Sequence, residues 1–347
     1  MQKEITCGSN LFDARGNLAQ TGWGRQLMMN YNREKIRVSM LRLKEWDCYC
    51  ILNPEFQLNL IVADVGYFGM AHVNWLDYKA GKDKSSIAVK LLTRGNLHLP
   101  PTADTGDVEF SKGGSWIKFK HIPGEVSLRE LTFDFPGYVF GGRKGISGRV
   151  TLTRDPKDDT MVNVIPFKDP GCFVYVQKIV SIPAVGKVVL GGDLYEFKGR
   201  ENNSYAALDW SRGVFPYFTE WWWSFASGAV NGKPFGFNID YGFGTESSKS
   251  MLYYDGKGHH LDEVIYTFDE REPQKPWQYR SNDGRVALQL EPVYSNKEDM
   301  NLLVLRTQGT HAYGFITGEV VLDDGTKLVI ERTHRVFGSA EYCKHRW

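Results

Sequence analysis

The chain has 347 residues, of which 42 are Lys or Arg and 41 are Asp or Glu, so its formal net charge is +1. A charge so close to zero provides no field that attracts polyanions, which argues against a nucleic-acid partner. With 42% hydrophobic and 24% charged residues the chain is neither disordered nor fibrous, and its length suggests about two domains.

Strand-like segments follow one another along the whole chain. Alternating or wholly apolar runs, separated by turn sequences rich in Gly, Asn and Asp, predict an all-β fold of antiparallel sheets that are closed or sandwiched. The sequence contains no apolar stripe of helical spacing long enough to indicate a major helix. The predicted strands cover residues 38–52, 57–67, 87–92, 116–119, 133–140, 148–153, 173–179, 187–190, 215–230, 233–243, 263–268, 286–290, 312–322 and 327–332.

A polar stretch without periodicity, residues 199–204, interrupts the strand pattern and predicts a domain boundary. We therefore expect one domain at 1–205 and a second at 206–347. The sequence has no uncharged apolar run of about 18 residues, and its first ten residues lack the apolar core of a signal peptide. These features predict a cytoplasmic protein without a membrane span, and they leave its oligomeric state open.

Metal and cofactor motifs are absent from the sequence. It contains no H-E-x-x-H, no phosphate-binding glycine loop and no G-x-S-x-G elbow. The C-x-C spacing of Cys48 and Cys50 differs from the C-x-x-C of zinc and redox sites, and an odd total of five scattered cysteines favours reduced thiols. We therefore expect neither a metal nor a cofactor.

The dipeptide Asn231-Gly232 predicts a β-hairpin, because it is the preferred sequence of a two-residue type I′ turn between strands. Such a turn fixes the register, with Val230 opposite Lys233. One face of this hairpin then carries aromatic and polar side chains together: Thr219, Trp221, Trp223, Phe225, Asn238 and Asp240. The other face is almost pure hydrocarbon apart from Glu220 and Ser224: Trp222, Ala226, Phe237, Ile239, Tyr241 and Phe243.

Asp240 is the leading catalytic candidate on the mixed face. Aromatic surface with a few convergent polar groups is typical of a ligand pocket. A carboxyl group beside Trp223 and shielded from water is expected to have a raised pKa, as a general acid near neutral pH requires. The alternative is that Asp240 is solvent-exposed or hydrogen-bonded at a sheet edge. Glu220 would take the role if the register slipped by one residue.

A second constellation consists of Glu45, Asp47 and Tyr49, which share one face of a predicted strand. Two carboxylates in this arrangement lie about 7 Å apart and can serve as an acid and base pair. The alternative is structural pairing with the arginines that lie close upstream, Arg25, Arg33, Arg37 and Arg42.

Motifs along the whole chain resemble the bacterial family catalogued as domain of unknown function 2804. They are LFDARGNL at 11–18, TGWGR at 21–25, YNR at 31–33, KEWDCY at 44–49, ADVGY at 63–67, LDWSRGVFPY at 208–217, GFN at 236–238, YGFG at 241–244, LDDGT at 322–326 and the final RW. That family has no assigned activity. It is distantly similar to the carotenoid-hydratase and AttH-like group, which is built from two lipocalin-like β-barrels and includes polyene hydratases and polyketide cyclases. The resemblance implies two lipocalin-like antiparallel β-barrels with a ligand cavity.

We therefore expect a cofactor-independent lyase or isomerase-type enzyme that hydrates, dehydrates, isomerises or cyclises an apolar unsaturated small molecule by acid–base catalysis. The expected catalytic residues are Asp240, Glu45 and Asp47. The expected substrate-binding residues are Trp221, Trp223, Phe225, Asn238, Thr219, Tyr49, Tyr217 and Tyr241. One alternative is a noncatalytic lipocalin-like binding protein. Another is a carbohydrate-processing enzyme, because indole platforms beside carboxylates also suit sugars.

Overall fold

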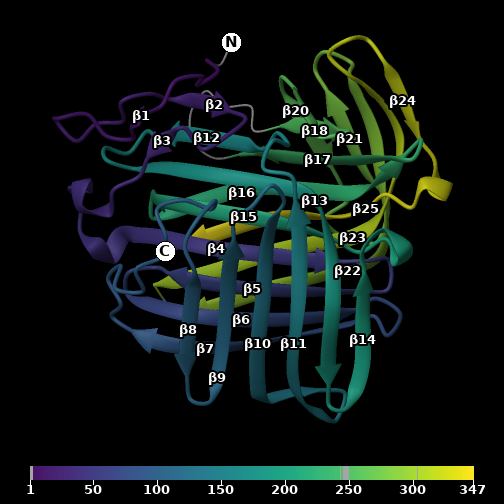
Figure 1. Cartoon of the computed structure of the whole chain (residues 1–347), viewed down its shortest axis with the longest axis horizontal. Helices are drawn as coiled ribbons and strands as arrows, with labels where there is room; N and C mark the ends of the chain where they lie inside the picture. The colour runs from purple at the N-terminus through teal and green to yellow at the C-terminus, as the bar shows by residue number, and fades with distance from the viewer. Residues whose placement is uncertain (1–2, 243, 245–249, 303) are drawn as a thin grey trace.

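The computed structural model describes residues 3–242, 244, 250–302 and 304–347 (Figure 1). The expected all-β fold is confirmed: within these residues the helical structure consists of four short 3-10 turns, η1 (Arg33–Lys35), η2 (Met40–Arg42), η3 (Gly199–Asn202) and η4 (Arg332–His334). No helix in the described part of the chain is long and apolar enough to cross a membrane.

The first large sheet has thirteen strands in the described residues, with the main order β7-β6-β5-β4-β15-β13-β11-β10-β9-β8. Its strands pair antiparallel and curl around the larger of the two main hydrophobic cores. The strands are β2 (Gly22–Gly24), β4 (Leu43–Leu52), β5 (Phe56–Asp64), β6 (Phe68–Asp77), β7 (Lys82–Leu91), β8 (Val108–Lys112), β9 (Ser115–Ile122), β10 (Ser127–Phe140), β11 (Arg143–Arg154), β12 (Met161–Pro166), β13 (Phe173–Leu190), β14 (Asp193–Lys198) and β15 (Tyr205–Val214).

The second large sheet has ten described strands, with the main order β19-β18-β17-β16-β25-β23-β22-β21-β20, again paired antiparallel around its own core. The strands are β16 (Phe218–Val230), β17 (Lys233–Tyr241), β18 (Met251–Tyr254), β19 (Lys257–His260), β20 (Val264–Thr267), β21 (Trp277–Ser281), β22 (Val286–Leu302), β23 (Leu305–Val321), β24 (Lys327–Ile330) and β25 (Phe337–Arg346). A separate parallel pair joins β1 (Ser9–Asn10) to β3 (Met29–Asn30).

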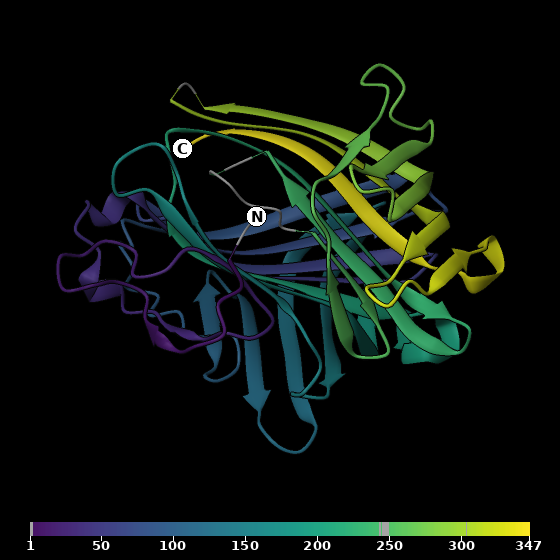
Figure 2. The same cartoon turned by 90° about the horizontal axis from the view of Figure 1, so that it is seen from above.

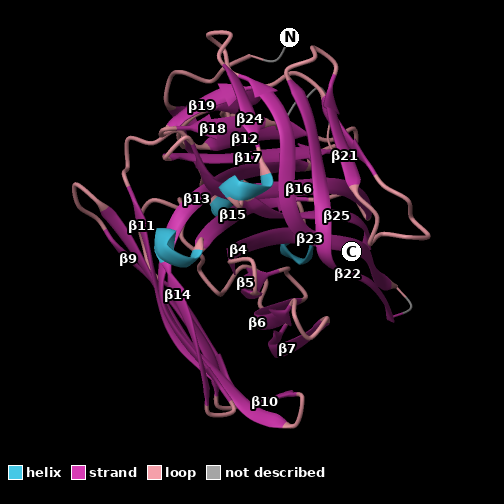
Figure 3. Cartoon of the chain, turned by 90° about the vertical axis from the view of Figure 1, so that its right-hand side faces the viewer, coloured by secondary structure: helices cyan, strands magenta, loops and turns pink. Residues whose placement is uncertain are grey.

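The two sheets face each other across the middle of the molecule. In Figure 2 the yellow-green strands of the second sheet arch over the blue and purple strands of the first. Figure 3 shows β10 at the far end of an arm that the first sheet extends away from the second. The chain passes from one sheet to the other between β15 and β16, just after the polar stretch at 199–204. The domain boundary at 205/206 stays a prediction.

The hairpin register predicted from Asn231-Gly232 is confirmed pair by pair. Asn231 and Gly232 have φ angles of 52° and 76°, the positive values that a type I′ turn requires at both central positions. Strands β16 and β17 pair from Val230 opposite Lys233 to Trp222 opposite Tyr241. The hydrocarbon face packs in the second core, as expected. Phe243, predicted at the end of that face, lies outside the described residues.

The predicted strands leave out twelve of the described strands, and several others differ from the prediction in length. The strands left out are β1, β2, β3, β6, β8, β12, β14, β15, β18, β19, β21 and β25. Residues 173–179 and 187–190 belong to one strand, β13, which bends at Ser181 where φ is 58°. Strand β22 continues to Leu302, and β23 begins at Leu305, so both are longer than predicted. Strand β25 was not predicted, because its cavity-facing positions are occupied by Ser, Glu and His.

Candidate functional site

A cavity of about 600 Å³ separates the two sheets. Its volume lies within the range of about 300–1,000 Å³ that is typical of small-molecule sites. One wall comes from β4–β7, β13 and β15, and the other from β16, β17, β22, β23 and β25. Much of the lining is apolar, and its large aromatic members are Trp46, Tyr67, Phe68, Phe215, Trp221, Trp223, Phe225, Tyr313 and Trp347.

Five residues form one row across the second sheet and all line this cavity. The strand register places Asp240 beside Trp223, Trp223 beside Glu341, Glu341 beside His311, and His311 beside Asn296. Neighbouring strands lie about 4.8 Å apart, so Asp240 and Glu341 flank Trp223 with their backbones roughly 10 Å apart. Two carboxyl groups therefore border the same patch of aromatic wall.

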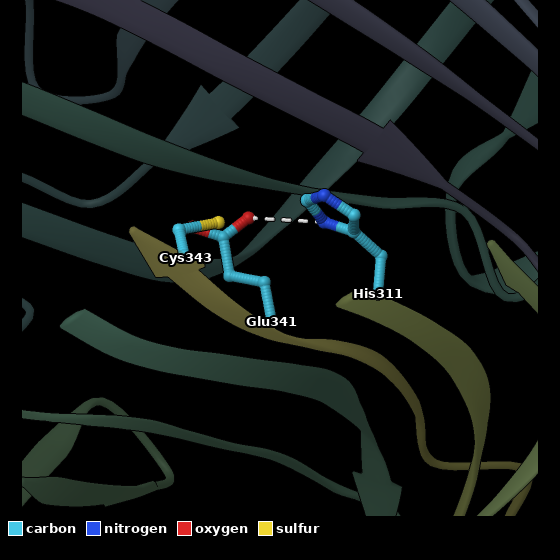
Figure 4. Close-up of side chains that lie close together, drawn as sticks. All are labelled: His311, Glu341 and Cys343. Carbon is cyan, nitrogen blue, oxygen red and sulfur yellow. Dashed lines mark ion pairs between the residues drawn. The ribbon is translucent and has the colours of Figure 1, made fainter. Parts of the chain in front are cut away.

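His311 is ion-paired on both ring nitrogens. Nδ1 lies 3.4 Å from Oε2 of Glu341, and Nε2 lies 3.5 Å from Oε1 of Glu298 (Figure 4 shows the pair with Glu341). Burial by itself would lower the pKa of His311, but the two carboxylates outweigh it and raise that pKa to about 10. The hydrogen bond to His311 also lowers the pKa of Glu298. At neutral pH the side chain of His311 is therefore an imidazolium that lies between Glu341 and Glu298.

Glu341 is oriented by the indole of Trp221, whose Nε1 donates to Oε1 at 2.8 Å. The sulfur of Cys343 completes a group whose potential metal-ligand atoms, with those of His311 and Glu341, lie within 4.8 Å of one another (Figure 4). Burial raises the pKa of the Cys343 thiol well above its usual value, and a metal binds the thiolate instead.

Gly309 makes room for the His311 ring. A Cβ atom at position 309 would lie 2.5 Å from Nε2 of His311 and 3.1 Å from Cγ of Glu298. Real Cβ contacts are not this close, so the imidazole can lean over residue 309 toward Glu298 because that residue has no side chain.

Two further histidines line the cavity in the neutral form. Burial lowers the pKa of His72, on the first sheet, to about 4. It lowers the pKa of His345, on the second sheet, to about 4 as well. The ring of His345 stacks on Trp221 with centroids 4.2 Å apart. Neutral imidazoles add hydrogen-bonding capacity to the cavity without adding charge.

Four of the residues predicted from the hairpin line the cavity: Trp221, Trp223, Phe225 and Asp240. Asp240 is 2% exposed. Asn238 is fully buried and does not line the cavity; its Oδ1 accepts a hydrogen bond of 2.8 Å from Nε1 of Trp223. Thr219 does not line the cavity either and accepts a hydrogen bond from Nε1 of Trp347 at 3.0 Å.

The second constellation lies on the other face of β4, away from the cavity. Glu45 pairs at 2.7 Å with Arg33, one of the upstream arginines named in the alternative. Asp47 pairs at 2.7 Å with Arg212 of β15, which is not one of those arginines. Tyr49 packs in the first core.

The two other predicted tyrosines also lie apart from the cavity lining. Tyr217 is 45% exposed and its hydroxyl donates to the carbonyl of Val304. Tyr241 packs against the second core, where its hydroxyl donates to the carbonyl of Tyr266 at 2.7 Å.

Sequence reasoning missed Glu298, His311 and Glu341. Around Glu298 the chain reads Asn296-Lys297-Glu298-Asp299, which is polar on both faces of the strand and does not mark the side that faces the cavity. The segment 337–346 carried a usable signal, because Ser339, Glu341, Cys343 and His345 recur there with period two.

Comparison with known proteins agrees with this architecture. CghA, in its structure with Sch210972, is 12% identical, with 86% of this chain and 87% of that chain covered and a TM-score of 0.50. An AttH-like protein of Nitrosomonas europaea is 12% identical over 88% of this chain and 92% of its own, with a TM-score of 0.42. Kievitone hydratase of Nectria haematococca is 10% identical over 88% of each chain, with a TM-score of 0.45.

At these identities the similarity to CghA concerns the fold, which is the expected one of two lipocalin-like antiparallel β-barrel units. No curated protein matches the chain in sequence. The model of the family described as domain of unknown function (DUF2804) matches residues 2–347. The chain therefore belongs to the domain of unknown function 2804 family.

Proposed function

We propose that the protein is a lyase or isomerase-type enzyme that performs acid–base chemistry on an apolar unsaturated small molecule in the cavity between the sheets. The observation that carries the proposal is the row in which Asp240 and Glu341 flank Trp223 inside a mainly apolar cavity. Hydration, dehydration, isomerisation and cyclisation of a double bond each need a proton donor and a proton acceptor near one substrate.

The two carboxyl groups have different surroundings, and this difference assigns their roles. Glu341 receives a hydrogen bond from Trp221 and pairs with the imidazolium of His311, and these contacts suit the role of proton acceptor. Asp240, almost fully buried at the other side of Trp223, donates the proton. His311 and Glu298 are positioning residues, because they hold the charge and orientation of Glu341.

The apolar lining favours a hydrocarbon-rich substrate over a sugar. Hydrogen-bonding side chains are present in the lining, but most of the surface that the wall exposes to the cavity is apolar. Glu45 and Asp47 are engaged with arginines on the far side of β4, and Glu220 is exposed to solvent. The proposed chemistry therefore rests on the cavity row and does not use these three carboxylates.

The proposal is tested by incubating the purified protein in D₂O with an apolar extract of its own host and following the compounds by liquid chromatography and mass spectrometry. We expect one compound to gain or lose water, take up deuterium or change retention time. Asp240→Asn and Glu341→Gln should abolish the change, whereas the exposed control Glu220→Gln should retain it. Compounds that bind without any conversion would instead identify a carrier protein.

A further inference from the structure

A buried ion pair lies on the wall opposite the proton-transfer row. Lys178 of β13 and Asp209 of β15 are register partners, and Nζ of Lys178 lies 2.8 Å from Oδ2 of Asp209. Lys178 is 4% exposed and Asp209 is 7% exposed, and both line the cavity. Burying two charges is costly, so a pair on a ligand-facing wall calls for a reason beyond stability.

The carboxylate of Asp209 is held from three sides. Besides the ion pair, Oδ2 accepts a hydrogen bond from Nε1 of Trp46 at 3.0 Å, and Oδ1 accepts one from Oγ of Ser211 at 2.8 Å. These contacts fix the carboxyl group of Asp209 in place. Asp209 thereby balances the charge of Lys178 and sets the direction of its ammonium group.

The ammonium of Lys178 reaches the proton-transfer row. Nζ lies 4.0 Å from the centroid of the Trp223 ring, and Trp223 is the register partner of Asp240. Among the described residues, Asp209 is the ion-pair partner of this ammonium. Since an ammonium carries three N–H donors, Lys178 can also donate to a molecule in the cavity.

We infer that Lys178 binds an oxygen acceptor of the substrate, and that the substrate class is an apolar molecule with a conjugated carbonyl group. This inference rests on the proposed function. The pair with Asp209 is already neutral overall, so a neutral carbonyl oxygen suits it better than a second carboxylate. An ammonium over Trp223 also disfavours a carbocation at that ring and favours negative charge that develops on oxygen.

The site can then hydrate such an enone with all atoms accounted for. Glu341 takes a proton from water as its oxygen bonds to the β-carbon. The electron pair of the double bond shifts toward the carbonyl oxygen, and the resulting enolate accepts hydrogen bonds from Lys178. Asp240 gives its proton to the α-carbon, which restores the carbonyl. Exchange of the proton from Glu341 to Asp240 through solvent resets the site, and the net reaction is addition of one water.

The test compares the affinities of two probes of equal carbon number, the enone β-ionone and the hydrocarbon ionene, measured by quenching of tryptophan fluorescence. We expect the wild type to bind β-ionone roughly tenfold or more tightly than ionene, because a hydrogen bond to a charged donor discriminates to that extent. In the double variant Lys178→Met/Asp209→Asn, which removes both charges together, the preference should fall to about one. The ultraviolet band of bound β-ionone should be red-shifted in the wild type only.

The matched control is Lys187→Met/Glu196→Gln, which removes an exposed ion pair between β13 and β14 and should leave both affinities unchanged. Equal wild-type affinities for the two probes, or a preference for β-ionone that survives in the double variant, would overturn the role of Lys178 and leave the apolar site standing. Absence of binding of both probes to the wild type would overturn the proposed function, and the role of Lys178 with it.

Discussion

Nδ1 of His311 lies 3.4 Å from Oε2 of Glu341, across the boundary between strands β23 and β25 that are paired at these two residues. The pair places a fixed positive charge next to a carboxylate on the wall of a largely apolar cavity. It links the backbone register of the second sheet to the chemistry of the site, because a slip of one residue would turn both side chains into the second core.

Replacement of His311 by Gln should make protein stability depend less on pH. The pKa of His311 is about 10 in the folded protein and near 6.5 in the unfolded chain, so the folded state binds the proton more tightly. The resulting stabilisation is complete below about pH 6.5, declines as the pH rises, and is lost above pH 10. Urea unfolding of wild type and His311→Gln at pH 6, 8 and 10 should show a difference that shrinks steadily. A constant difference would contradict the raised pKa.

Gly309→Ala should displace the His311 ring without unfolding the protein. The new methyl group would lie 2.5 Å from Nε2, so the imidazole must move away from Glu298 and its pKa should fall. Proton titration of His311, followed by NMR of its Cε1 position, measures this directly. Gly137→Ala is the matched control, because a Cβ there meets nothing within 4 Å. An unchanged His311 pKa in Gly309→Ala would show that Glu298 contributes little.

Asp240→Asn and Glu341→Gln should each lower turnover about 100-fold or more, the usual size of a lost acid or base. Ligand affinity should change only a few fold, because both replacements keep the size of the side chain. Single-turnover rates and tryptophan fluorescence titrations on the compound found in the extract separate the two effects. A variant that loses affinity in proportion to turnover would point to a binding role for that residue.

Asp47→Asn should destabilise the protein and leave the chemistry intact. The change leaves the guanidinium of Arg212, which is fully buried, without its anionic partner, and breaking a buried pair in this way costs about 3–5 kcal/mol. Denaturant unfolding measures the loss, and turnover per folded molecule should stay at the wild-type level. Loss of turnover in a folded Asp47→Asn protein would return this carboxylate to the catalytic site.

Short-range features of the sequence were sufficient for the all-β fold and for the β16–β17 hairpin. A two-residue turn at Asn231-Gly232 fixes every pair up to Trp222 and Tyr241, because side chains alternate strictly along both strands. The division of this hairpin into a core face and a cavity face with Trp223 and Asp240 followed from the same rule.

Tertiary structure decided which carboxyl groups line the cavity. Glu45 and Asp47 share a face by local geometry, yet that face turns toward Arg33 and Arg212 and away from the cavity. The polar residues that share the cavity row with Asp240 come instead from β22, β23 and β25, whose pairing joins residues far apart in the chain.

By itself, then, the sequence determined the strand character of the chain and the hairpin that carries Trp223 and Asp240, since both depend on contacts within a few residues. The cavity, the charged surroundings of His311 and the place of Lys178 were decided only when the two sheets came together. The polar residues of the two sheets that line the cavity have the same pattern in a linear sequence as polar residues that face water.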